Sequence, residues 1–451
     1  MKQLLLHPLI FTLIIGTALV YLPLAFQLIN TNINLVGKFE KVCIFLLLLS
    51  IGGGGGFSLL NKFNPDTLYI TGKTLPSMIM QLGVYLLCCL FLASRLRKTL
   101  KDSINIIFTL VKNHPFFCFY HLAALLSSLL SQNPGLALRT NIVIVVTALV
   151  FIYVGKQYRM KELFTMVVWY HTVLLLMSVL QGNHGESWTG VLGHKNQFGP
   201  TMALTAVLLY LQSVRLPKYR WLFLGLAALA IFCVQKANSG MAKVVLMVLI
   251  SLLGFLRFVR RLPPRLAFAC MGVFLAIGMA LVIFLTENAE YIVVEKLGKD
   301  MTLTGRTYIW PLVIAAINKR PWLGYGYQGF WQPWRGDANL GLEIITPDGF
   351  IAMHSHNGFL DMALELGWGG LSLFIISLLM NIYYGVRHLT RSKGPESVLP
   401  LLIFTWIVIT NITEVGINLI SRSWVFYVLM TARLTMNQGL EDFRSNSKFQ
   451  E

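Results

Sequence analysis

The stretch 287–368 carries two clusters of reactive residues, which are Gly305-Arg306-Thr307 and His354-Ser355-His356-Asn357-Gly358. It is the one long polar segment of the sequence, and apolar runs flank it on both sides. These runs approach the length of about 20 residues that a helix needs to cross a bilayer. We therefore expect 287–368 to form a large loop outside the membrane, held by the helices around it.

The composition is typical of a membrane protein. Of the 451 residues, 56% are hydrophobic and only 12% are charged, and the mean hydropathy is +0.66. Soluble globular proteins carry about 25% charged residues. The sequence therefore predicts an all-α, polytopic membrane protein and excludes a soluble globular fold.

Apolar runs of about the spanning length recur along most of the chain. They cover residues 8–28, 42–60, 78–94, 115–131, 140–155, 163–181, 198–213, 221–235, 241–256, 266–286, 369–386, 398–413 and 421–436. Counting all of them as spans would place the N-terminus outside, a side that Lys2 disfavours. We expect about twelve transmembrane helices, with a non-spanning segment around the glycines at 52–56, and keep about thirteen as the alternative.

Basic residues predict the orientation of these spans. Clusters of Lys and Arg fall in every second connection, at 95–101, 156–161, 215–220, 257–265, 387–393 and in the tail from Arg433. The positive-inside rule places these connections in the cytoplasm and the long loop outside. The net charge of +18 then reflects a lipid bilayer as partner, and no nucleic acid is expected.

The chain accordingly divides into three predicted parts. Residues 1–286 form the first transmembrane region, 287–368 the catalytic loop, and 369–451 the last transmembrane helices with a cytoplasmic tail. The cysteines lie in or beside apolar runs without metal-ligand spacing, which predicts neither disulfides nor a metal site. Gly72-Lys73-Thr74 ends like a phosphate-binding loop, but Thr67 replaces its first glycine, so no nucleotide site is expected.

Several cations lie where predicted spans meet the outer face. They are His194-Lys195-Asn196 directly before a span, Lys236 and Lys243 around the next outward end, and Arg139 at a third. Free backbone N–H groups and the helix dipole favour anions at such helix starts. These cations can converge on one phosphate-bearing ligand, or they can anchor the helices at the membrane surface.

The first cluster of the loop begins a predicted helix over 307–319. Arg306 lies in its first turn, and its planar guanidinium suits a bidentate grip on phosphate, with a structural ion pair as the alternative. Trp310 follows in the same helix, and Tyr325 lies in a glycine-rich turn. Their rings are available to stack on sugar or to lie at the membrane surface.

The second cluster holds a pair of histidines. His356 suits a general base, because a neutral imidazole near pH 7 can take a proton from a hydroxyl group. His354 and Asn357 lie beside it as candidate substrate ligands. Two alternatives stay open: a metal site completed by Asp361 and Glu365, or a histidine that caps the following helix.

These motifs together resemble the O-antigen ligase and polymerase superfamily. The resemblance rests on the Gly305-Arg306-(x)3-Trp310 segment, Pro321-(x)2-Gly324-(x)-Gly326, His356-Asn357-(x)2-Leu360-Asp361 with Glu365-Leu366-Gly367, and Gly193-His194-Lys195-Asn196. It implies a multi-pass glycosyltransferase of the bacterial inner membrane that needs neither a cofactor nor a metal. The donor would be an undecaprenyl-diphosphate-linked oligosaccharide, used on the periplasmic face.

The same resemblance implies roles for two residues. Arg306 would engage the donor diphosphate, and His356 would activate the acceptor hydroxyl or assist the departing diphosphate. The family often has a second arginine just after a serine at an outward helix end; here Ser239-Gly240 stands instead, which leaves Lys236 and Lys243 as candidates.

The predicted function is polymerisation of surface-polysaccharide repeat units, O-antigen or exopolysaccharide, favoured by the Gly193-His194-Lys195-Asn196 segment. One alternative is a ligase that transfers the glycan to lipid A core during lipopolysaccharide biosynthesis. Another is a transporter or flippase of lipid-linked saccharides, which would call for charged residues in the middle of spans.

Overall fold

The computed structural model describes residues 33–50, 96–181, 187–287, 305–331, 340–344, 352, 354–417 and 421–447. The longer helices in these ranges are α3 (Ile33–Ser50), α7 (Leu96–Asn113), α8 (Pro115–Ser127), α9 (Pro134–Gln157), α10 (Met160–Gln181), α11 (Lys195–Arg215), α12 (Arg220–Lys236), α13 (Gly240–Val259), α14 (Pro264–Glu287), α15 (Gly305–Lys319), α16 (Gly358–Arg391), α17 (Leu399–Asn411) and α18 (Arg422–Ser447). Short 3-10 turns are η2 (Ser128–Leu130), η3 (Gly190–Leu192), η4 (Pro217–Tyr219), η7 (Leu340–Glu343) and η8 (Pro395–Val398). Within these ranges every regular element is helical.

Among the described residues, six helices are long and apolar enough to cross a membrane, and they are α9, α10, η4 with α12, α13, α14 and α16. Two shorter apolar helical segments, Pro115–Leu130 and Pro395–Asn411, join them. The prediction of an all-helical, polytopic membrane protein is therefore confirmed. The count of about twelve spans stays a prediction, because the runs 8–28 and 78–94 and the glycines at 52–56 lie outside the described residues.

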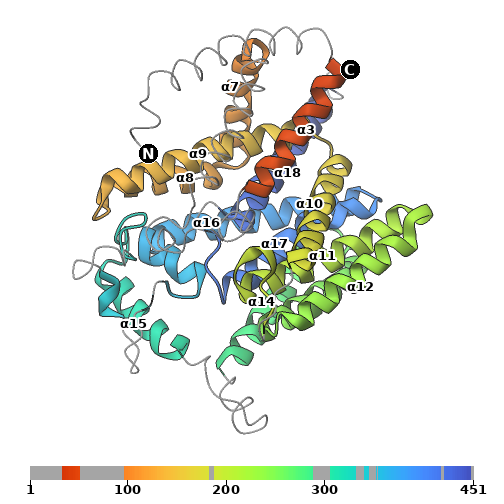
Figure 1. Cartoon of the computed structure of the whole chain (residues 1–451). Helices are drawn as coiled ribbons and strands as arrows, with labels where there is room; N and C mark the ends of the chain where they lie inside the picture. The colour runs from red at the N-terminus through yellow and green to blue at the C-terminus, as the bar shows by residue number, and fades with distance from the viewer. Residues whose placement is uncertain are drawn as a thin grey trace, which may run out of the picture.

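The helices form one bundle with a continuous apolar core (Figure 1). Asn133 caps the start of α9, because its side chain accepts a hydrogen bond from Leu136 N. Ser239 caps the start of α13 in the same way and accepts from Ala242 N. Such caps satisfy backbone N–H groups that a helix start leaves without partners. α11 packs against α10, α12 and α13, while α18 packs along α9 and α16 along α8.

Basic connections that were predicted to share one side of the membrane meet at one end of the bundle. Lys161 lies 3.9 Å from the carboxylate of Glu396, and Arg260 donates to the hydroxyl of Ser397 over 2.7 Å. We call this the basic end. The starts of α11, α13, α16 and α18 lie at the opposite end, which we call the site end.

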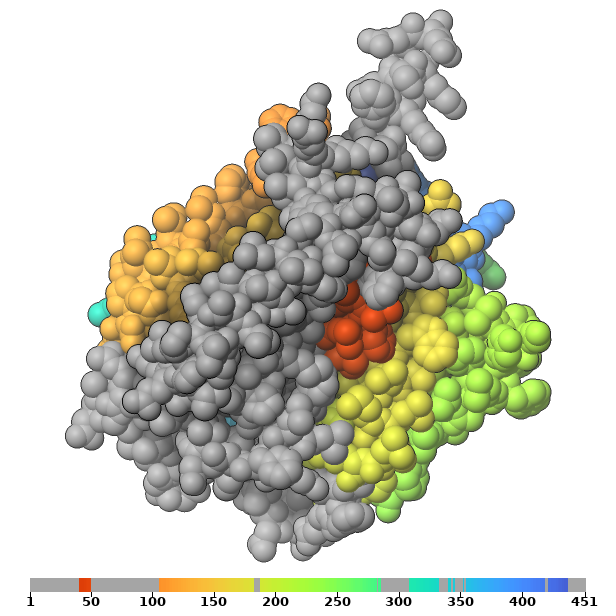
Figure 2. All heavy atoms as spheres, turned by 45° about the horizontal axis from the view of Figure 1, so that its top comes forward, coloured from red at the N-terminus to blue at the C-terminus, as the bar shows by residue number. Residues whose placement is uncertain are grey.

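One basic cluster differs from its predicted form. Residues around 95–101 were expected in a connection between spans, yet α7 is a helix over Leu96–Asn113. Its buried Ile106 and Leu110 are spaced four residues apart on one face, as in an amphipathic helix. Figure 2 shows α3 beside α10, where Lys41 pairs with Glu162 at 3.0 Å.

The described part of the outer loop has a small apolar core of its own. It forms between α15, the turns at 320–331 and the first part of α16, and its buried members include Ile309, Val313, Phe330 and Leu364. The predicted helix over 307–319 is confirmed by α15. Because this core includes Leu364 of α16, it attaches the described part of the loop to the bundle near the histidine segment, residues 354–358.

α16 is broken at Gly367, where φ is +67° and ψ is −178°. The break frees the carbonyls of Leu364 and Glu365, which accept from Tyr325 N and Gly326 N over 2.9 Å each. Trp368 N in turn donates to the carbonyl of Pro321 over 2.7 Å. The chain at 320–331 thus replaces backbone bonds that a straight helix would have made within itself.

Candidate functional site

A buried carboxylate, that of Asp361, fixes the backbone of the histidine segment, residues 354–358. Asp361 is 3% exposed, and its Oδ1 accepts from Ser355 N and from Trp331 Nε1, both over 3.0 Å. Trp310 Nε1 donates to the carbonyl of Ser355 over 3.0 Å, which ties the segment to α15. These bonds fix the backbone on which His354 and His356 stand.

His356 has a left-handed backbone, with φ at +55°. This conformation is uncommon for a residue other than glycine and often occurs at functional sites. Asn357, the next residue, is the cap of α16, because its Oδ1 accepts from Phe359 N and Leu360 N. The alternative in which a histidine caps this helix is therefore wrong, and the side chain of Asn357 is engaged in the cap.

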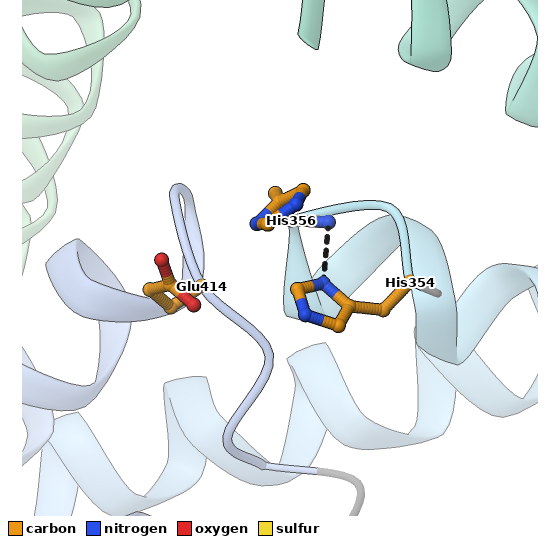
Figure 3. A group of neighbouring side chains, drawn as sticks. All are labelled: His354, His356 and Glu414. Carbon is orange, nitrogen blue, oxygen red and sulfur yellow. Dashed lines mark hydrogen bonds between the residues drawn. The ribbon is translucent and has the colours of Figure 1, made fainter. Parts of the chain in front are cut away.

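His354 and His356 lie near the carboxylate of Glu414, which belongs to the connection between α17 and α18. Nδ1 of His354 accepts from the backbone N of His356 over 3.2 Å, and the ring centroids are 4.1 Å apart. One nitrogen from each ring and one oxygen of Glu414 lie within 4.8 Å of one another. Figure 3 shows the two rings and the carboxylate of Glu414 around a shared space.

Glu414 connects this cluster to the start of α11. Its Oε1 accepts from Asn196 Nδ2 over 2.8 Å, and Asn196 Oδ1 accepts from the hydroxyl of Ser239 over 3.3 Å. Lys195 is the first residue of α11 and His194 precedes it. The segment 194–196, the α12–α13 connection and the histidine segment, predicted to cooperate, are therefore brought together at the site end.

A further cation lies beside the same helix start. Arg422, the first residue of α18, donates to Oε1 of Gln197 over 3.3 Å. Within the part of the chain that the structure describes, no carboxylate lies at ion-pair distance from Arg422. Its guanidinium also interacts with the buried Tyr170 of α10.

The other predicted site residues are more dispersed. Lys236, Lys243 and Arg139 are exposed at the ends of α12, α13 and α9, and the ammonium of Lys236 lies 5.4 Å from the ring centroid of Phe232. Tyr325 is buried at 7% exposure and its hydroxyl donates to the carbonyl of Ala316 over 3.0 Å. Its position supports the loop, so its role as a sugar ligand stays a prediction.

Arg306 lies in the first turn of α15, but its side chain is outside the described residues. Its predicted contact with a diphosphate therefore stays a prediction.

Sequence reasoning missed Glu414 and Arg422. Both lie in or next to the outward connection at 413–420, which contains no reactive cluster that local spacing would identify. Their partners, Asn196 and Gln197, are 218 and 225 residues away along the chain. Only the packing of the α17–α18 connection against α11 shows that they belong to the site.

The structure changes which carboxylate a metal site at the two histidines would use. Asp361 and Glu365 were its expected carboxylates, yet Asp361 is occupied by Ser355 and Trp331. Glu414 is instead the carboxylate near both histidines. However, a metal-bound histidine normally donates from its second nitrogen, whereas Nδ1 of His354 accepts a backbone hydrogen bond, so this ring does not fit a ligand role.

Known proteins share this part of the chain. Residues 225–375 match the family described as O-antigen ligase. The exopolysaccharide production protein ExoQ of Rhizobium meliloti is 27% identical over 283 residues, 59% of this chain and 64% of that protein. The ComP-specific O-oligosaccharyltransferase of Acinetobacter baylyi is 27% identical over 214 residues, 44% of this chain and 36% of that protein.

Each match thus spans less than two thirds of the relative's own length. The family match includes α13, α14, α15 and the histidine segment, whereas Asn196, Glu414 and Arg422 lie outside it. Residues 225–375, about a third of the chain, are thus similar to the O-antigen ligase family.

Proposed function

We propose that this protein is a glycosyltransferase of the bacterial inner membrane that polymerises repeat units of a surface polysaccharide. It moves a saccharide from an undecaprenyl diphosphate to an acceptor hydroxyl on the periplasmic face, without a metal or another cofactor. The observation that carries the proposal is the meeting of His356 with the start of α11 through Glu414 and Asn196. A base and an anion-binding helix start are the two parts that this transfer needs.

The leaving diphosphate is bound by cations at the site end. Lys195 supplies one positive charge at the start of α11, where the helix dipole also favours an anion. Arg422 supplies a second through a group that can bind phosphate oxygens in pairs, and Arg306 is proposed as the third. Charges that are fixed before the reaction stabilise the departing diphosphate at little reorganisation cost.

His356 acts as the general base. It takes the proton of the acceptor hydroxyl while the hydroxyl oxygen bonds to the anomeric carbon of the donor. The bond from that carbon to the phosphate oxygen breaks, and the polyprenyl diphosphate leaves with its electron pair. Attack from the face opposite the leaving group inverts the configuration of the anomeric carbon.

The relatives and the placement of the site favour polymerisation over the ligase and flippase alternatives. The exopolysaccharide production protein ExoQ matches a longer part of this chain than the oligosaccharyltransferase does. The site residues gather at helix ends, whereas a flippase would call for ionisable groups along a path in the middle of the spans. An enzyme acting at one membrane face therefore fits better than a transporter.

Reconstitution tests the proposal. The purified protein is placed in liposomes with a polyprenyl-diphosphate-linked oligosaccharide, and the products are separated by size. We expect a ladder of longer lipid-linked glycans from wild type, and a rate about 10²–10⁴-fold lower from His356→Ala, the usual contribution of a general base. His388→Gln, a histidine at the basic end of α16, is the matched control and should retain the ladder.

Other products identify the alternatives. Glycan transfer only after addition of lipid A core would make the protein a ligase. Movement of the lipid-linked saccharide across the bilayer without any new glycosidic bond would identify the protein as a flippase and not an enzyme. An active His356→Ala protein would refute the assignment of the base.

A further inference from the structure

We propose that Glu414 is a positioning residue that orients His356 and stabilises the imidazolium formed during transfer. The proposal rests on the function proposed above, because it assigns the partner of the same base. Sequence spacing gave no sign of it, since Glu414 lies 58 positions after His356 by their numbers. The proposal rests on the arrangement of His354, His356 and Glu414, which come from two segments far apart in the sequence.

Glu414 is held from two directions. Its side chain accepts from Asn196 over 2.8 Å, and its backbone carbonyl accepts from Gly358 N over 3.2 Å. Gly358 is the first residue of α16 and stands two residues after His356. The carboxylate is thus fixed relative to the histidine segment, as required of a group that positions another.

The separation suits a charge interaction. The carboxylate oxygen lies within 4.8 Å of a nitrogen of His354 and of His356. An anion at about 4–6 Å favours the protonated form of an imidazole. When His356 takes the proton of the acceptor hydroxyl, the charge that develops on its ring is therefore opposed by the negative charge of Glu414.

The protonation of His354 favours this role over a metal centre. Its Nδ1 accepts from the backbone N of His356, so in the neutral ring the proton resides on Nε2. A protonated Nε2 can donate to a carboxylate but has no lone pair for a metal. His354 therefore lies near Glu414 as a hydrogen-bond donor and not as a metal ligand.

Other charges act on this cluster and enter its pH dependence. On α16, Asp361 interacts electrostatically with His354. On α11, Lys195 neighbours the Asn196 that holds Glu414. On α18, Arg422 is bound to Gln197 of the same helix start. Each is unchanged in a Glu414 variant, so a shift seen there reports the lost carboxylate.

The test compares the pH dependence of kcat in wild type, Glu414→Gln and Glu414→Asp. Without the carboxylate, the pKa of His356 falls, and because the neutral ring is the active form, the acidic limb of the profile moves to lower pH. We expect a shift of about one pH unit and a kcat about 10–100-fold lower, with the donor KM unchanged. Glu414→Asp should restore part of kcat.

Glu162→Gln is the matched control, because this carboxylate pairs with Lys41 on another face of the bundle. It should retain the wild-type profile. A Glu414→Gln enzyme with an unchanged acidic limb, or one changed only in KM, would overturn the positioning role.

A second measurement does not depend on activity. Diethyl pyrocarbonate modifies neutral imidazole, so its rate against pH, read at His356 by fragment mass spectrometry, gives the pKa of the ring. A lower pKa in Glu414→Gln supports the proposal, and an equal pKa overturns it. Stoichiometric zinc in the purified wild type that is lost from Glu414→Gln would also overturn it, in favour of a metal centre.

The two proposals can fail separately. If wild type forms no glycan from any lipid-linked donor, the proposed function is refuted, and the modification curve still decides whether Glu414 and His356 are coupled.

Discussion

Asp361 illustrates how one buried residue supports the site without touching a substrate. Its oxygen satisfies Ser355 N and Trp331 Nε1, which lie on different turns of the loop. Removing it leaves two buried donors without an acceptor, and each such group costs about 1–3 kcal/mol. The effect on the histidines is indirect, through the backbone that carries them.

We therefore expect Asp361→Ala to lower the free energy of unfolding by about 2–6 kcal/mol. Thermal unfolding in detergent measures this as a lower midpoint. Glu162→Ala removes a half-exposed carboxylate from its ion pair with Lys41, a kind of pair worth about 0–1 kcal/mol. Equal midpoints for the two variants would contradict the supporting role of Asp361.

Arg422 leads to a prediction about binding. Arg422→Ala removes a cation from the start of α18, so the donor KM should rise about tenfold or more, given about 1.5–3 kcal/mol for a hydrogen bond to a charged group. The measurement is the rate of glycan formation against donor concentration. Arg261→Ala, which removes an exposed arginine at the basic end, should leave KM unchanged.

At the scale of elements, the break in α16 and the turn at 324–326 depend on each other. Gly326 has a φ of +86°, and a Cβ there would lie 2.7 Å from the carbonyl carbon of Leu130. A Cβ at Gly324 would lie 2.6 Å from the carbonyl carbon of Glu365. The turn therefore reaches both η2 and α16 only because these two residues lack side chains.

Gly326→Ala should lower the thermal midpoint and disrupt activity. The left-handed conformation alone costs about 1–2 kcal/mol for alanine, and the contact with Leu130 adds to this cost. Gly225→Ala, in α12, is the control, since a Cβ there meets nothing within 4 Å and alanine favours a helix by about 0.5–1 kcal/mol. A stable, active Gly326→Ala protein would show that the turn tolerates displacement.

At the scale of the whole molecule, the two ends of the bundle should lie on opposite sides of the membrane. Lys236 at the site end and Arg261 at the basic end are both exposed. In a chain whose native cysteines are replaced, Lys236→Cys should react with an impermeant maleimide added to the periplasmic side. Arg261→Cys should react only after the membrane is opened, and the reverse pattern would invert the proposed orientation.

Local patterns in the sequence were sufficient to predict the helical class and much of the bundle. Apolar runs such as 140–155 and 241–256 lie within α9 and α13, because helix formation in a bilayer depends on local hydrophobicity and internal backbone bonding. The same holds for α15, whose apolar periodicity is contained within its own residues. The histidine segment and residues 194–196 were predicted to share one site, and the structure brings them together through Glu414.

Tertiary structure decided which side chains complete the site. Glu414 and Arg422 reach the start of α11 across 218 and 225 residues, and a contact of that range depends on how whole helices pack. Packing likewise placed Tyr325 in the core of the loop and made Asn357 the cap of α16. The sequence by itself determined the membrane helices and the reactive residue types, because both are local properties; the partners of His356 followed only from the fold.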